Sequence, residues 1–394
     1  MTPAGGGVGP DPAAVPPEVS PLASAAAVEA GVEESAEEQA AEERVEREGV
    51  SLARRLRQPR TILSIAVPLA IIAFFVWKNG QEFGKVPGII AHANLLLVLA
   101  AFLMYYAGFP LRGYRWARLL RGTGFDIPTR DATEIIFLSW LVNCVVPAKL
   151  GDVYRAWLLK MNSVASLSRT FGTVFIERIL DLFAIAVLGL AAGFWSFRNG
   201  LPPAIQLVAV IGVAVVVVLA ALLLTMRNFG RAILVRLPLP SRFIELYDRF
   251  EHGVFGAVGL RDLPPLVVLT VLTWATESLR LYLVVRALGL PGVDLGLSGS
   301  VFVALIGSLL TAVPLTPAGL GVVDGGMIFV LTTAYGISAG SAGAIVLLDR
   351  AISVFTIIVL GAIAYVLSGK PRGEGRIEVR ARTLQAAPGG RGEA

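Results

Sequence analysis

Long runs with little or no charge most constrain what this chain can fold into. Hydrophobic residues make up 55% of the 394 residues and charged residues only 16%, whereas about a quarter of the residues of a soluble domain are charged. Several of the runs reach the roughly 17 to 25 residues that a helix needs to cross about 30 Å of hydrocarbon. The sequence therefore predicts an all-α polytopic membrane protein.

The reactive residue types are scarce. The chain has two histidines and one cysteine, too few to form a cluster of the usual metal ligands. Cys144 lies in an apolar run, which favours a small buried hydrophobe over a reactive thiol. No cofactor, no metal site and no nucleic-acid partner are expected.

The charges between the apolar runs indicate three regions and their orientation. Residues 1–58 read as a disordered tail, 59–369 as a transmembrane domain and 370–394 as a second disordered tail. Both tails carry basic residues, and Arg112, Arg115, Arg118 and Arg121 follow a run that ends at Pro110. The positive-inside rule therefore places both termini, and the loop predicted after Pro110, in the cytoplasm.

About six runs are predicted to cross the membrane fully, at residues 61–77, 94–110, 172–195, 204–226, 265–288 and 342–367. Between two of them, residues 227–261 alternate arginines with apolar side chains. Such a segment is expected to lie on the anionic lipids of the inner leaflet.

A proline, a glycine and three charged residues interrupt an apolar segment at residues 143–155, which read N-C-V-V-P-A-K-L-G-D-V-Y-R. The preceding run, 132–146, is short, and residues 149–169 are basic. A full crossing would place this basic stretch outside. A helical hairpin that enters from the cytoplasm and turns at residues 147–151 avoids the conflict, because non-helical backbone is tolerated where it lines a cavity.

A second interruption, P-L-T-P-A-G-L-G-V-V-D, lies at residues 314–324. P-A-K-L-G in the first and P-A-G-L-G in the second are both followed by an aspartate, Asp152 or Asp324. An acidic-arginine pair, Glu177-Arg178 or Asp349-Arg350, begins 25 residues after each aspartate. If the span at 265–288 runs outward and the span at 342–367 runs inward, the segment between them begins and ends outside. The second hairpin then enters from the opposite face, so we predict two re-entrant hairpins in an inverted repeat. The alternative is a plain eight-span bundle.

Ionisable residues inside a membrane are costly and normally face the protein interior, where they pair with each other or contact substrate. Arg178 with Asp181, and Glu277 with Arg280, have the i,i+3 spacing of helix neighbours. Arginines near broken helices can also bind a phosphate through paired hydrogen bonds. The predicted substrate-binding and translocation residues are Asn143, Pro147, Gly151, Asp152, Arg155, Glu177, Arg178, Asp181, Glu277, Arg280, Pro314, Pro317, Gly319, Gly321, Asp324, Asp349 and Arg350.

Four motifs together resemble the lysylphosphatidylglycerol synthase transmembrane family, also called the flippase-like domain family. They are N-x-x-x-P-x-x-x-G-[D/E]-x-x-R at 143–155, E-R-x-x-D at 177–181, P-x-x-P-x-G-x-G-x-x-[D/E] at 314–324, and the pair at 349–350. The sequence departs from the family pattern by having Asp152 and Asp324 where glutamate is commoner, and Ala318 where a second glycine is common.

The resemblance implies a multi-pass domain of the bacterial plasma membrane that moves a phosphate-bearing lipid, either a phospholipid or a polyprenyl-phosphate lipid. The cytosolic aminoacyltransferase domain of the full-length synthases is not expected, because 27 residues follow Leu367. A homo-oligomer or a cell-envelope enzyme is a possible partner. The alternatives are a membrane-embedded glycosyltransferase or other transferase, with Asp152 or Glu177 as general base, and a scaffold without transport.

Overall fold

The structure, a computed structural model, describes residues 80–146, 149–163, 165–198, 254–259, 261–311 and 316–375, together with isolated residues between 200 and 251 and residues 377, 380 and 381. All of them belong to one compact unit that begins at Leu63. The predicted first tail, the predicted span at 61–77 and most of residues 204–246 lie outside the described residues, as do Pro147 and Pro314 of the predicted site.

The described residues are almost entirely helical. The first half contains α4 (Gly80–Phe83), α5 (Val86–Ala91), α6 (Leu95–Gly122), α7 (Thr129–Val145), α8 (Leu150–Asn162) and α9 (Leu167–Ser196). The second half contains α12 (Leu263–Leu288), α13 (Gly296–Leu310), η1 (Pro317–Gly319), α14 (Val322–Tyr335), α15 (Ala339–Arg350), η2 (Ala351–Phe355), α16 (Thr356–Leu367) and η3 (Lys370–Arg372). Two-residue strands β1 (Phe125–Asp126) and β2 (Arg380–Ala381) pair antiparallel.

Among the described residues, four helical stretches are long and apolar enough to cross a membrane: Leu95–Gly122, Leu263–Leu288, Pro317–Tyr335 and Ala339–Leu367. This confirms the all-α membrane protein that the apolar runs predicted. The last stretch is α15 and α16 joined by the π-helical turn η2, which starts directly after Arg350. Such turns inside α-helices are frequent at functional sites.

Helix α6 corrects one sequence-based prediction. The side chain of Asn94 caps its start by accepting hydrogen bonds from the backbone of Leu96 and Leu97. The helix then continues through Pro110 to Gly122, although we expected a cytoplasmic loop after Pro110. A proline inside a membrane helix is tolerated when neighbouring groups compensate for the lost backbone bond. Arg112 and Arg115 are consequently buried inside the helical unit.

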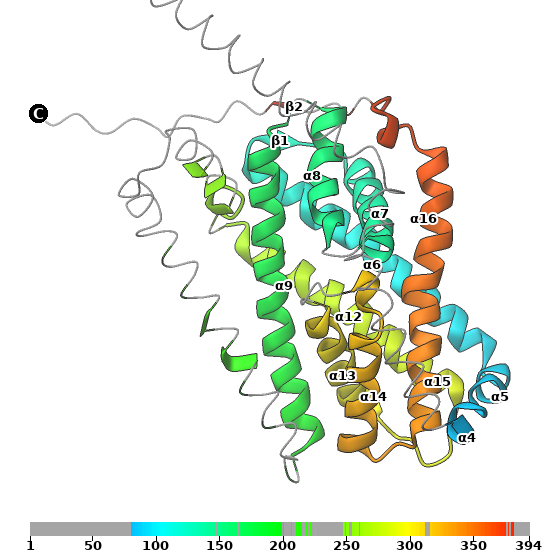
Figure 1. The fold of residues 1–394 in the computed structure, drawn as a ribbon. Coiled ribbons are helices and arrows are strands. Elements are labelled where there is room, and N and C mark those ends of the chain that lie inside the picture. The colour runs from blue at the N-terminus through cyan, green and yellow to red at the C-terminus, as the bar shows by residue number, and fades with distance from the viewer. Residues whose placement is uncertain are drawn as a thin grey trace, which may run out of the picture. The chain divides into compact units, whose positions relative to one another are not determined.

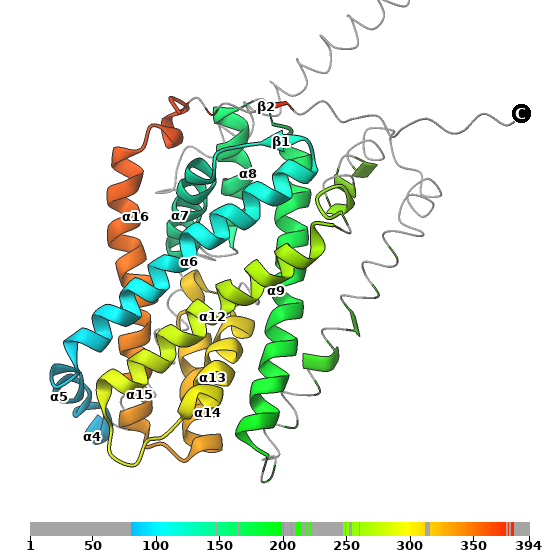
Figure 2. The same ribbon diagram turned by 180° about the vertical axis from the view of Figure 1, so that it is seen from behind.

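The two broken segments form two antiparallel helix pairs. Helix α7 packs on α8, and α13 packs on α14. In Figure 1 the α7–α8 pair lies in the upper half of the view and the α13–α14 pair in the lower half, while α9 runs beside both. Seen from behind, α6 and α12 cross the unit next to each other (Figure 2), and they pack together. The break η1 contacts α7, so the two broken segments meet.

Glycines allow close packing within each pair. A Cβ added to Gly151 on α8 would lie 2.1 Å from the backbone oxygen of Ser139 on α7. On α14, a Cβ added to Gly326 would lie 2.2 Å from the Leu310 side chain. The backbone oxygen of Ser139 cannot move aside, so the α7–α8 crossing depends on a residue without a side chain at position 151. At Gly326 the contact is with the end of a flexible leucine side chain, which can rearrange.

The segment after α16 is bound to the α7–α8 pair. Lys370 Nζ contacts Asp131 Oδ1 at 2.9 Å and Glu134 Oε2 at 2.5 Å, both on α7. On α8, the Asn162 side chain donates to the Lys370 carbonyl, and the Asn162 carbonyl accepts from Ile377 N at 2.9 Å. We expected residues 370–394 to lack structure, but the first residues of this tail are held against both helices.

Candidate functional site

A cavity of about 350 Å³ lies where the two broken segments meet. Lys149 and Asp152 line it from the first break, and Ala318 and Gly319 line it from the second. Helices α6, α9, α12, α13 and α15 supply further lining residues. The cavity therefore draws on both halves of the chain.

Each break carries an aspartate that is paired with an arginine 26 positions later. Asp152 receives two hydrogen bonds from Arg178, 2.8 Å from Nη2 and 2.9 Å from Nε. Asp324 Oδ1 lies 2.8 Å from Nε of Arg350, which also donates to the carbonyl of Ala318. Paired contacts between an arginine and a carboxylate fix orientation as well as charge. Each pair ties a broken segment to the helix that follows it.

The acidic residue before each of these arginines has its own arginine from another helix. Glu177 lies 3.0 Å from Arg115 on α6 and 3.2 Å from Arg155 on α8. Asp349 lies 3.1 Å from Arg280 on α12. All five side chains are buried. Residues i and i+1 on a helix point in different directions. The acidic residue and the arginine of each dipeptide therefore take part in different ion pairs.

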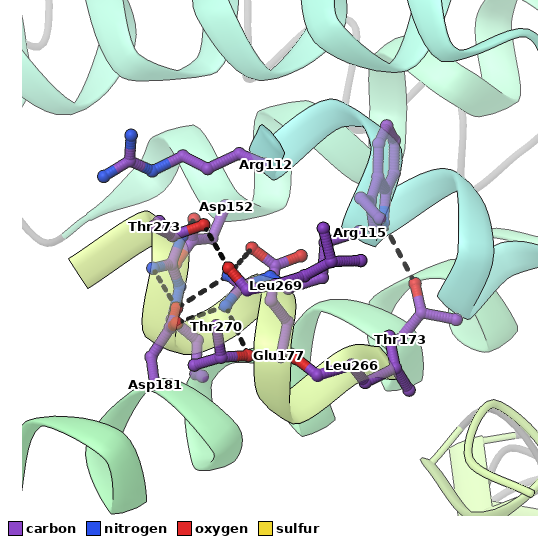
Figure 3. A network of polar contacts seen from close by, with 12 residues as sticks. Arg112, Arg115, Asp152, Thr173, Glu177, Asp181, Leu266, Leu269, Thr270 and Thr273 are labelled. Carbon is purple, nitrogen blue, oxygen red and sulfur yellow. Dashed lines mark hydrogen bonds and ion pairs between the residues drawn. The ribbon is translucent and has the colours of Figure 1, made fainter. Parts of the chain in front are cut away.

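Further contacts link the two halves. Arg115 also contacts Asp181 at 2.6 Å and donates to Thr270 on α12, as the cluster in Figure 3 shows. Glu277 on α12 lies 2.5 Å from Arg112 on α6 and 3.3 Å from Arg280. The predicted i,i+3 pairs Arg178–Asp181 and Glu277–Arg280 are both present, at 3.4 Å and 3.3 Å.

Polar side chains also hold the backbone at the two breaks. The Asn143 side chain accepts a hydrogen bond of 2.9 Å from Gly151 N, at the start of α8. At the start of α14, Asp324 Oδ2 accepts one of 2.8 Å from Gly321 N. These contacts satisfy backbone donors that a helix start leaves without an intrahelical partner. Asn143 and Asp324 thus stabilise the backbone at the two breaks, and Asp324 in addition pairs with Arg350.

Every described charged residue of the predicted site takes part in an ion pair, and the pairs form three clusters. The first is centred on Glu177, Arg178 and Asp181. The second joins Glu277, Arg280 and Asp349, and the third is the pair Asp324–Arg350. Arg155 and Asp324 do not line the cavity, but their partners Glu177 and Arg350 do. Of the predicted glycines and prolines in the described part, Gly319 lines the cavity, whereas Gly151, Pro317 and Gly321 shape the breaks without lining it.

Sequence reasoning missed three cationic residues that line the cavity: Arg112, Arg115 and Lys149. The two arginines were assigned to a loop, although their i,i+3 spacing on a continuing apolar pattern was a signal for a shared helix face. Lys149 has a left-handed backbone, with φ 52° and ψ 36°. For a residue with a side chain this costs on the order of 1 kcal/mol.

The chain is similar to several archaeal membrane proteins. A UPF0104 membrane protein of Methanocaldococcus jannaschii is 39% identical over 226 residues, which are 57% of this chain and 92% of that protein. A UPF0104 membrane protein of Methanothermobacter thermautotrophicus is 26% identical over 316 residues, 75% of this chain and 89% of that protein.

The glycosyltransferase AglD of Haloferax volcanii is 26% identical over 352 residues. These residues are 80% of this chain but 55% of AglD, so the chain spans about half the length of that relative. Residues 61–361 match the family described as the lysylphosphatidylglycerol synthase TM region. This match includes both broken segments and every ion pair of the cavity, and the chain belongs to the lysylphosphatidylglycerol synthase transmembrane family.

Proposed function

We propose that the protein moves a phosphate-bearing lipid from one leaflet of the membrane to the other. The head group passes through the cavity while the hydrocarbon chains stay in the bilayer. A volume of about 350 Å³ lies at the lower end of the roughly 300 to 1,000 Å³ of small-ligand pockets. It suits a head group and is too small for two acyl chains.

The observation that carries the proposal is the convergence of two broken segments on one charged cavity. Transporters built from inverted repeats bind their substrates between such broken helices, near the middle of the bilayer. Arg178 and Arg350 occupy equivalent places in the two halves, each paired with the aspartate of its own break. This repetition supports two re-entrant hairpins, α7–α8 and α13–α14, among about six full spans, rather than an eight-span bundle.

Under this proposal the α7–α8 hairpin enters from the cytoplasmic face and α13–α14 from the opposite face. Rocking one half against the other would open the cavity to each leaflet in turn. The basic residues at the C-terminal end of α6 and in η3 then lie at the inner leaflet, where anionic lipids attract them.

Reconstitution in liposomes with fluorescent phospholipids tests the proposal. The native protein should move labelled lipid between leaflets at least tenfold faster than protein-free vesicles do. Arg178→Gln should reduce this rate strongly, because Asp152 then loses its bidentate partner at the cavity wall. Lys85→Gln provides a control, since Lys85 is exposed and pairs only with nearby Glu82 in the described part. Rates equal to those of empty vesicles for every lipid class would refute lipid movement.

A transferase acting on a polyprenyl phosphate is the second candidate, and the similarity to AglD favours it. It would need a carboxylate that accepts a proton, and Asp152 and Glu177 are both engaged by arginines. Incubation with radiolabelled nucleotide sugars and polyprenyl phosphate decides between the candidates. Product that disappears in Asp152→Asn would establish the transferase.

A further inference from the structure

The ion pairs around the cavity form three clusters, which together make a network of charges with no net charge. Six arginines take part: Arg112, Arg115, Arg155, Arg178, Arg280 and Arg350. Six carboxylates also take part: Asp152, Glu177, Asp181, Glu277, Asp324 and Asp349. Every carboxylate lies within ion-pair distance of at least one arginine. With all twelve groups ionised, their charges cancel.

Lys149 adds a positive charge that this network does not balance. It lines the cavity, and it forms no ion pair or side-chain hydrogen bond with the residues that the structure describes. A charge held next to a cavity inside a membrane protein is costly unless a partner compensates it. Asp152 and Asp181 attract the Lys149 ammonium group and Arg178 repels it, but both carboxylates already pair with arginines. The charged groups around the cavity, with Lys149 included, therefore have one net positive charge that a ligand could balance.

A second donor points to the same kind of ligand. Arg112 is 4% exposed, and its Nη2 contacts Glu277 while Nη1 is buried without a hydrogen-bond partner among the described residues, as are the Nε atoms of several other arginines of the cavity. Arg112 also lines the cavity. Buried donors are normally satisfied, so this nitrogen offers a place for an acceptor oxygen.

The backbone at Lys149 has a conformation that favours glycine. Ala318 in the second break shares it, with φ 51°, so the conformation supports a role for the lysine side chain only together with its place at the cavity. In P-A-K-L-G and P-A-G-L-G, Lys149 corresponds to Gly319, and both have positive φ, 52° and 70°. Glycine adopts this conformation freely, whereas lysine does not. The first break thus has a lysine at a position where the second break has glycine, the residue that this backbone conformation favours.

We propose that Lys149 is the residue that binds the lipid phosphate, and that the lipid carries one phosphodiester charge. This rests on the proposed function and names the substrate class of that site. One negative charge neutralises Lys149, with Arg112 Nη1 as a further donor. A phosphomonoester brings a charge of about −1.5 to −2 at pH 7, which would leave an excess negative charge among partly buried groups.

Lipid binding to the full chain in detergent, followed by native mass spectrometry, tests this assignment separately from transport. The probes are phosphatidylglycerol, a phosphodiester with one charge, phosphatidylcholine, which is zwitterionic, and phosphatidic acid, a phosphomonoester. The native protein should bind phosphatidylglycerol at least tenfold more tightly than either of the others.

Four variants separate the charge of Lys149 from its place in the fold. In Lys149→Gly and Lys149→Gln the preference for phosphatidylglycerol should fall by at least fivefold, and Lys149→Arg should keep most of it. Lys149→Gly suits the backbone, so an unfolding temperature at or above the native value excludes misfolding as the cause. Lys85→Gln, an equal charge change at an exposed site, should keep the native preference.

Two binding results would overturn the assignment, and one transport result given below would do so as well. The binding results are an unchanged preference in both Lys149→Gly and Lys149→Gln, and tighter binding of phosphatidic acid than of phosphatidylglycerol. The proposed function can fail independently. If the protein binds phosphatidylglycerol through Lys149 but moves no lipid in liposomes, transport is refuted while the anion site stands. If it moves lipids equally well with and without Lys149, transport stands and the anion site is refuted.

Discussion

The two broken segments share one design of ion pairs and differ in the charge they add to it. In each, the aspartate of the break pairs with an arginine 26 residues later, and the acidic residue before that arginine pairs with an arginine of α6 or α12. The first segment adds Lys149 and Arg155. In the second segment Gly319 takes the place of Lys149, since each lies two residues before the glycine of its break. Met327 takes the place of Arg155, since each lies three residues after the aspartate.

This difference indicates a division of roles. The ion pairs that both segments share tie each break to the helices around it. Lys149 and Arg155, which only the first segment has, make that segment the more cationic one. The outer ends differ as well, because η3 and Ile377 hold α7 and α8 together. The second pair is bridged differently, because Phe197, directly after α9, packs against Phe302 on α13 and Tyr335 on α14. The first pair is therefore the more charged one, and its bridge is an ion pair where that of the second pair is aromatic.

Removing the acidic residue of each dipeptide gives the largest expected effects. Glu177→Gln leaves Arg155 buried without an ion-pair partner among the described residues, while Arg115 keeps Asp181. Breaking a buried pair in this way costs about 3–5 kcal/mol. Asp349→Asn should cost about half as much, because Arg280 keeps Glu277 as a partner. Thermal unfolding in detergent compares the two variants. An equal or larger loss in Asp349→Asn would contradict the asymmetry.

The close crossing of α7 and α8 predicts the next effect. Gly151→Ala places a Cβ against the backbone oxygen of Ser139, and overpacking of this kind costs about 1–3 kcal/mol. The matched control is Gly325→Ala on α14, where a Cβ meets nothing within 4 Å. There the change should be neutral or stabilising by about 0.5–1 kcal/mol. Denaturation curves that show equal losses would refute the packing argument.

The tail contact should contribute on the order of 1 kcal/mol through Lys370. Burial alone lowers the pKa of Lys370, but the hydrogen bonds to Glu134 and Asp131 raise it above its ordinary value of 10.5. A raised pKa in the folded state means that the stabilisation is complete below pH 10.5 and is lost as the pH rises through the folded-state pKa.

Unfolding temperatures of the native chain and Lys370→Gln, followed from pH 7 to pH 11.5, test this dependence. Their difference should stay constant up to about pH 10 and shrink above about pH 10.5. A difference that already changes between pH 7 and pH 9 would assign the contact to another titrating group.

The smallest expected effect on stability has the opposite sign. Lys149→Gly should stabilise the protein by about 0.5–1 kcal/mol, since glycine tolerates the positive φ and an unpaired charge is removed. Thermal unfolding in detergent without added anionic lipid measures it. A loss of more than about 1 kcal/mol would show that the Lys149 side chain supports the fold rather than a ligand.

Much of the helical framework was predictable because periodicity and charge act locally. The predicted run at 132–146 corresponds to α7, the span at 172–195 lies within α9, and the span at 265–288 lies within α12. The end of α6 was not predictable from Pro110. Proline normally stops a helix, and the partners that bury Arg112 and Arg115 come from residues 62 to 165 positions away.

Most charged residues of the site could be predicted from the sequence, but the ion pairs that they form could not. Glu177, Arg178, Asp349 and Arg350 stood out because charge is rare inside apolar runs. Which arginine meets which carboxylate depends on how helices distant in sequence cross, and nothing local encodes that. Lys149 was visible only by comparing the two breaks residue by residue, where a lysine occupies the position of a glycine.

The side from which each hairpin is reached tests the central claim most directly. On a Cys144→Ser background, single cysteines report the outer ends of the two pairs. One replaces Arg130, which is exposed in the first turn of α7, and the other replaces Asp294, which is exposed before α13. With a membrane-impermeant thiol reagent, the account predicts labelling of Arg130→Cys only from the cytoplasmic side and of Asp294→Cys only from the opposite side. Labelling of both from the same side would contradict the two opposed hairpins and support an eight-span bundle.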